Sequence, residues 1–108
     1  MAIDLFCYSS LDSNAVRGEL DLVVKRSSDL FPSKFSISDV KDLTNSKSYY
    51  DLMEIEISRE NGLVAQCSFV VNLNDKRFVE LLSAVEIILK NALGEEKILL
   101  LLNNEERR

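Results

Sequence analysis

The sequence contains no histidine, and this absence narrows the chemistry that the chain can perform. Without imidazole, neither a Ser-His-Asp nor a Cys-His catalytic arrangement can form, and most zinc and iron sites are excluded too. The glycines Gly18, Gly62 and Gly94 are dispersed, whereas a phosphate-binding loop needs several glycines at the start of one helix. The sequence therefore predicts no catalytic residues, no metal site and no cofactor, and the chain is expected not to be an enzyme.

Cysteine and long hydrophobic runs are also scarce. Cys7 and Cys67 belong to no CxxC pair, so we interpret both as small buried side chains. The first residues, Met1–Leu5, lack the basic lead and apolar centre of a signal peptide. The longest aliphatic run, Ile98–Leu102, is far shorter than the roughly 20 apolar residues that span a membrane. We expect a cytoplasmic protein that does not contact a membrane.

The balance of charge is acidic, with 13 Lys and Arg against 18 Asp and Glu and a formal net charge of −5. This charge opposes sequence-independent binding to phosphate backbones, so nucleic acid is a poor candidate for a direct partner. It favours association with a basic protein instead. Because 46% of the residues are hydrophobic and 29% are charged, we expect residues 1–108 to form a single packed domain.

Hydrophobic periodicity predicts strands and two amphipathic helices along the chain. The expected strands are Ala2–Tyr8, Lys34–Val40, Leu52–Ser58, Leu63–Leu73 and Lys97–Leu102. The expected helices run from about Ser13 to Asp29 and from Asn74 or Asp75 to Gly94, and Lys41–Tyr49 and Asn103–Arg108 are expected to be a mobile connection and a frayed tail. The predicted fold class is α+β, a single mixed sheet of about five strands with two packed α-helices, in the order β-α-β-β-β-α-β.

The segment Asp51–Gly62 allows two interpretations. Met53, Ile55 and Ile57 alternate with Glu54 and Glu56, which favours a half-buried strand followed by an Asn-Gly hairpin turn. A helix that ends at Gly62 is the alternative, because glycine commonly follows the last residue of a helix. The strict alternation makes the helix our second choice.

Acidic and tyrosine side chains gather around this segment and suggest an interaction surface. Carboxylates would steer a basic partner, and tyrosines are frequent interface anchors because they offer a large contact area. The predicted contact residues are Asp39, Asp42, Tyr49, Tyr50, Asp51, Glu54 and Glu56. A solvated sheet face at Glu54 and Glu56, and packing of one tyrosine on the edge of the core, are the simpler explanations.

Three stretches of the chain, Met1–Ser10, Asn61–Lys76 and Ile98–Arg108, resemble bacterial contact-dependent growth inhibition (CDI) immunity proteins. The resemblance implies that the protein binds and neutralises the C-terminal toxin domain of a cognate effector. Toxins of this kind are often nucleases, whose basic clefts an acidic binder would complement. It further implies a stoichiometric complex that buries roughly 1,600 Å² in total.

Two other functions remain open from the sequence. The sheet and helices could surround a small-molecule pocket or mediate dimerisation in a regulatory domain. A carboxylate-dependent hydrolase is less favoured, because no nucleophile-base pair or metal cluster is apparent. The sequence predicts neither the oligomeric state nor the chemistry of the toxin.

Overall fold

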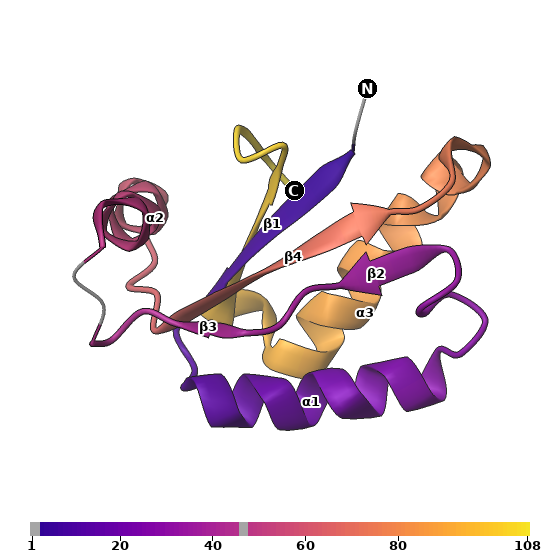
Figure 1. Cartoon of the computed structure of the whole chain (residues 1–108), viewed down its shortest axis with the longest axis horizontal. Helices are drawn as coiled ribbons and strands as arrows, with labels where there is room; N and C mark the ends of the chain where they lie inside the picture. The colour runs from indigo at the N-terminus through magenta and orange to yellow at the C-terminus, as the bar shows by residue number, and fades with distance from the viewer. Residues whose placement is uncertain (1–2, 46–47) are drawn as a thin grey trace.

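The centre of the fold is β1 (Asp4–Ser9), which pairs along its whole length with β4 (Cys67–Leu73) on one side. On its other side β1 pairs with β5 (Ile98–Leu102), whose predicted position inside the sheet is confirmed. The computed structural model, shown in Figure 1, describes residues 3–45 and 48–108. Within these residues, one sheet has the strand order β2-β4-β1-β5-β6, and β3 pairs with β4 beyond the end of β2.

Every strand pair in the described part of the sheet is antiparallel, so the α+β class is confirmed but the prediction of a mixed sheet is wrong. The reason lies in the connections. The chain leaves β1, forms a helix and returns as β2 (Phe35–Ile37) on the far side of β4. It likewise leaves β4 and returns as β5 on the far side of β1. Strands of the same direction are therefore always separated by one of opposite direction, which is the split β-α-β arrangement.

Two helices, α1 (Ser13–Arg26) and α3 (Leu82–Leu93), cover one face of this sheet and contact each other (Figure 1). Both were predicted from their apolar stripes, since residues three and four apart share one side of a helix. α1 begins at Asp12, whose side chain accepts a hydrogen bond from the Ala15 N–H. The buried side chains of this layer form the main core, which includes Leu5, Val16, Leu20, Phe35, Phe69, Val85, Leu89 and Leu100.

The other face of the sheet carries a smaller apolar cluster. Because side chains alternate along a strand, Tyr8 of β1 and Leu99 and Leu101 of β5 point away from α1 and α3. Ile55 and Ile57 pack against this cluster from a third helix. β1 and β5 are consequently buried on both faces, as the continuous apolar run of β5 indicated.

The third helix, α2 (Tyr49–Glu60), corrects the prediction of a strand at Leu52–Ser58. The side chain of Ser48 accepts a hydrogen bond from the Asp51 N–H and starts the helix. At its end the Leu63 N–H donates to the Ser58 carbonyl, and Gly62 has a φ of 85°, so the expected hairpin turn is a helix terminus. The alternative interpretation of this segment is the correct one.

Several other boundaries differ from the sequence-based expectation. β3 (Lys41–Asp42) lies in the connection that was predicted to be mobile, and β6 (Glu106–Arg107) lies in the predicted frayed tail and pairs with β5. The helix expected from Asp75 begins as the 3-10 helix η1 (Lys76–Leu81), and a second 3-10 helix, η2 (Glu95–Lys97), precedes β5. Positions 46 and 47 of the predicted mobile connection lie outside the described residues. No helix in the described part is long and apolar enough to cross a membrane.

Candidate functional site

Five of the predicted contact residues lie on α2, and two of these face the sheet. Asp51 and Glu54 are one turn apart and point toward the sheet, where Lys41 of β3 lies between them. The Lys41 Nζ is 2.7 Å from Asp51 Oδ1 and 2.9 Å from Glu54 Oε2. The Ser68 hydroxyl of β4 donates a further hydrogen bond of 3.1 Å to Glu54 Oε2. Both carboxylates therefore attach α2 to the sheet.

The ion pairs of Lys41 are partly shielded from water. The side chains of Asp51 and Glu54 retain 13% and 20% of their accessible surface, and that of Lys41 retains 43%. Burial alone would lower the pKa of Lys41, but its hydrogen bonds to Asp51 and Glu54 outweigh burial and raise that pKa above its ordinary value. Lys41 thus stays charged throughout the neutral range and holds the inner side of α2.

The first turn of α2 carries two large aromatic side chains that are exposed to solvent. Tyr49 and Tyr50 retain 72% and 76% of their accessible surface, and their ring centroids are 5.8 Å apart in an edge-to-face arrangement. Leu52, Met53 and Glu56 are exposed as well. We call the set Tyr49, Tyr50, Leu52, Met53 and Glu56 the outer face of α2.

The sequence-based prediction included both tyrosines and Glu56 of this outer face but missed Leu52 and Met53. A strand would have placed Met53 in the core and Glu54 beside Glu56. In a helix, positions 49, 52, 53 and 56 lie on one side, and Glu54 turns to the other. The signal that could have revealed the helix is Ser48 followed three residues later by Asp51, a common pattern at helix starts.

Asp39 and Asp42 precede α2 on the edge of the sheet, and both are exposed. Asp42 Oδ1 accepts hydrogen bonds from the Thr44 hydroxyl at 2.6 Å and the Thr44 N–H at 2.8 Å. These bonds, that of the hydroxyl first, lower the pKa of Asp42 below its ordinary value. Asp39 lies on the rim of a groove between this edge and α1. The structure therefore leaves Asp39 and Asp42 as exposed carboxylates on the sheet edge and Glu56 as an exposed carboxylate on α2.

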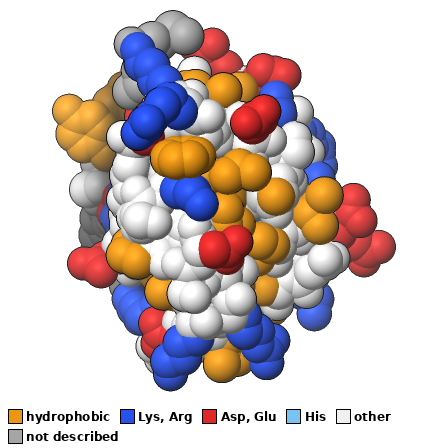
Figure 2. Space-filling model, turned by 90° about the vertical axis from the view of Figure 1, so that its right-hand side faces the viewer, with side chains coloured by type: hydrophobic (Ala, Val, Ile, Leu, Met, Phe, Trp, Pro, Cys, Tyr) orange, Lys and Arg blue, Asp and Glu red, His pale blue; other side chains and the backbone are white. Residues whose placement is uncertain are grey.

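Figure 2 views the end of the molecule opposite α2, where basic and acidic side chains are interspersed around a group of hydrophobic ones. In residues 3–45 and 48–108, no three His, Cys, Asp or Glu side chains come together as a metal site would require. The two exposed tyrosines of α2, in edge-to-face contact with each other, form an aromatic surface that is accessible to another protein.

Comparison with known proteins identifies the family. The model of the CDI system immunity component family matches residues 1–106, almost the whole chain. The chain belongs to this family. The resemblance noted from the three sequence stretches is thereby confirmed, and it extends over the α2 region as well.

Two similar proteins cover this CDI immunity component from end to end. It is 43% identical over 108 residues to the immunity protein CdiI-2 of Burkholderia pseudomallei strain 1026b, with all of both chains aligned. It also matches a chain in the solved CdiA-CT/CdiI toxin and immunity complex from Burkholderia pseudomallei, with a TM-score of 0.86 and 40% identity. That match covers 98% of this chain and 96% of the other. The fold, including the split β-α-β sheet, is therefore one that occurs in a toxin and immunity complex.

Proposed function

We propose that this protein binds the C-terminal toxin domain of a cognate CDI effector and neutralises it by stoichiometric association. The observation that carries the proposal is the end-to-end similarity to an immunity protein and to a chain of a toxin and immunity complex. The chemistry of the described residues agrees with a binding role, because α2 presents exposed tyrosines on a firmly attached helix. No cofactor takes part in this mechanism.

The outer face of α2 is the proposed centre of the toxin contact. Tyrosine side chains contribute large contact area with few rotatable bonds, so their burial against a partner is favourable. Leu52 and Met53 extend the apolar area between the tyrosines and the rest of the helix. Asp51 and Glu54 act indirectly in this proposal, since their ion pairs with Lys41 hold the tyrosines in place.

The toxin domain is proposed to be a nuclease that is met in the cytoplasm. A nuclease must attract phosphate groups and therefore commonly presents a basic cleft. The net charge of −5 complements such a cleft, and Asp39, Asp42 and Glu56 would steer the approach. Association should then slow as ionic strength rises, because exposed charges are screened over about 10 Å at 0.1 M salt.

Co-expression tests the function directly. The toxin domain of the cognate effector should arrest cells when expressed alone, and co-expression of this protein should restore growth. The two chains should co-purify in equal amounts, and equimolar protein should block degradation of nucleic acid by the toxin domain. If growth is not restored and the chains do not associate, the proposed function is wrong. A toxin that is inhibited but cleaves no nucleic acid would contradict only its assignment as a nuclease.

Variants at the outer face of α2 test the location of the contact. Loss of a buried aromatic anchor weakens binding by about 2 kcal/mol, so Tyr50→Ala should raise the Kd about 30-fold. Glu56→Lys should mainly lower the association rate, with a smaller effect at high salt. Val79→Ala and Glu80→Lys are matched controls, because η1 lies at the other end of the molecule (Figure 1). If all four variants bind the toxin domain equally well, the contact does not lie on α2.

A further inference from the structure

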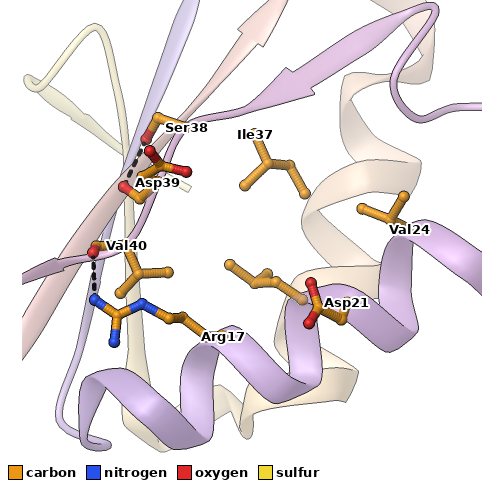
Figure 3. A pocket seen from close by; sticks show the side chains of 8 residues that line it. Arg17, Asp21, Val24, Ile37, Ser38, Asp39 and Val40 are labelled. Atoms are coloured by element: carbon orange, nitrogen blue, oxygen red, sulfur yellow. Dashed lines mark hydrogen bonds between the residues drawn. The ribbon is translucent and has the colours of Figure 1, made fainter.

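A groove of about 490 Å³ runs between α1 and the edge of the sheet. Leu20 and Val24 line it from the helix, and Ile37 and Val40 line it from the β2–β3 segment. Figure 3 shows Ile37 projecting from the strand toward the α1 side chains, with Asp21 and Asp39 at the two sides of the opening. The groove therefore combines apolar side chains on both walls with polar ones, among which are the carboxylates of Asp21 and Asp39.

The one basic side chain of the groove lining is already engaged. Arg17 Nη2 donates a hydrogen bond of 2.9 Å to the Val40 carbonyl oxygen, as the dashed line in Figure 3 shows. Asp21 and Asp39 are exposed. A basic group would be the favoured neighbour of these two carboxylates.

The strand that forms one wall of the groove is an edge strand. β2 stands at the end of the strand order and, within the residues that the structure describes, pairs only with β4. The N–H of Ser38 donates to the Val70 carbonyl, and the N–H of Asn74 donates to the Lys34 carbonyl. Because hydrogen bonding alternates along an antiparallel strand, the main-chain groups of Ile37 must point to the opposite side, away from β4. The N–H and the carbonyl of Ile37 therefore point outward from the edge of the sheet.

The geometry on either side of Ile37 limits this free edge. On one side the Phe35 N–H donates to the Leu30 carbonyl, so that position is already closed by the preceding turn. On the other side the pairing register shifts by one residue between Ser38 and Lys41, which is a β-bulge at Asp39 and Val40. The free edge is therefore short and centred on Ile37, directly beside the groove.

We propose that this groove binds an extended segment of the toxin domain, which pairs with β2 at Ile37 and adds a short strand to the sheet. The inference rests on the proposed function and adds to it a second contact with the toxin. An extended chain fits because it supplies a carbonyl and an N–H to Ile37 together. Alternate side chains of the segment would point toward Leu20 and Val24, so apolar residues belong there. A lysine or arginine of the segment would lie beside Asp21 or Asp39.

The edge that carries the groove also contacts α2. It continues from Ile37 through the bulge into β3, where Lys41 pairs with Asp51 and Glu54 of α2. A standard interface buries about 800 Å² on each partner, which is ample for both surfaces. One toxin domain would thus be held by the tyrosines of α2 and by main-chain pairing at β2.

Amide exchange of the isotope-labelled protein, measured by NMR with and without the toxin domain, tests this contact without any variant. The Ile37 N–H faces outward and should exchange readily in the free protein. One new hydrogen bond of about 1 kcal/mol corresponds to roughly fivefold slower exchange, and exclusion of water adds to this. Unchanged exchange at Ile37 in a saturated complex would overturn the strand pairing, even though the proposed function would stand.

A groove variant and a matched control provide the second measurement. Asp21→Arg reverses a rim charge and extends a long side chain across the groove, so it should weaken toxin binding at least about tenfold. Asp29→Arg makes the same charge change at an exposed position beyond α1 and should leave Kd within about twofold. Equal binding by both variants would contradict the inference. Failure of the unaltered protein to bind the toxin domain would overturn the inference together with the proposed function.

Discussion

Replacement of Lys41 by methionine is the most direct test of how α2 is held. Methionine retains the length and apolar stem of lysine but removes the ammonium group that lies between Asp51 and Glu54. Two carboxylates one turn apart would then lose the ion pairs that each makes with Lys41. Only the Ser68 hydroxyl would still donate to Glu54 from β4.

The size of the effect follows from the burial of the three side chains. Fully exposed ion pairs contribute about 0.2–1 kcal/mol, whereas removal of one partner from a buried pair costs about 3–5 kcal/mol. The side chains of Asp51 and Glu54 retain 13% and 20% of their accessible surface, and that of Lys41 retains 43%. This cluster is therefore neither fully exposed nor fully buried, and its contribution should lie between the two ranges. We expect Lys41→Met to lower the free energy of unfolding by about 2 kcal/mol, or the Tm by about 10 °C.

Chemical denaturation followed by circular dichroism measures this change, and a double-mutant cycle with Glu54→Gln isolates the pair. The glutamine can still accept from Ser68, so coupling with Lys41→Met reports the charge interaction and should be about 1 kcal/mol. Glu56→Gln is the matched control on the same helix, and it should change the free energy of unfolding by less than about 0.5 kcal/mol.

Amide exchange should locate the same change within the structure. In the Lys41→Met variant, amide exchange should become faster in α2 than in β1 and β4. The buried residues of β1 and β4 belong mainly to the core under α1 and α3, which the substitution does not touch. A loss of stability no larger than that of Glu56→Gln, with unaltered exchange in α2, would refute the reasoning that ion pairs hold this helix.

Three further predictions concern buried and strained positions. Burial first, and then the charge of Glu54, raise the pKa of Tyr8 from 10.0 to about 12, so the stability that this phenol contributes is complete below pH 10.0 and is lost as pH rises through 12. Tyr8→Phe should reduce this alkaline loss in pH-dependent unfolding; an unchanged profile would contradict the assignment. Burial raises the pKa of Cys67 to about 11, so its thiol should react slowly with a disulfide reagent at about pH 8 until the protein unfolds, and rapid labelling of the folded protein would disprove this. Gly62→Ala should lower the free energy of unfolding by about 1 kcal/mol because φ is 85° there, as thermal unfolding can show; Gly18→Ala, inside α1 with open space around it, should not destabilise.

Much of the architecture could be predicted from the sequence because the decisive pattern is local. The apolar stripes at Val16, Leu20 and Val23 and at Val85 and Leu89 match the period of a helix, and each is buried where predicted. The continuous run Ile98–Leu102 predicted an inner strand, since only a strand covered on both faces is apolar throughout. These features indicate an α+β domain whatever the order of the strands in the sheet.

Tertiary structure alone decided the strand order and the state of residues 49–60. Alternating Met53, Ile55 and Ile57 can serve a strand or a weakly amphipathic helix, and the sequence does not show which surface will cover them. In the fold, the small cluster on the second face of the sheet receives Ile55 and Ile57, and Lys41 arrives on β3 to pair with Glu54. The residues that contact α2 come from strands that only the folded sheet brings together. The helical state of residues 49–60 therefore depends on packing and on partly buried charge, which no local sequence pattern encodes.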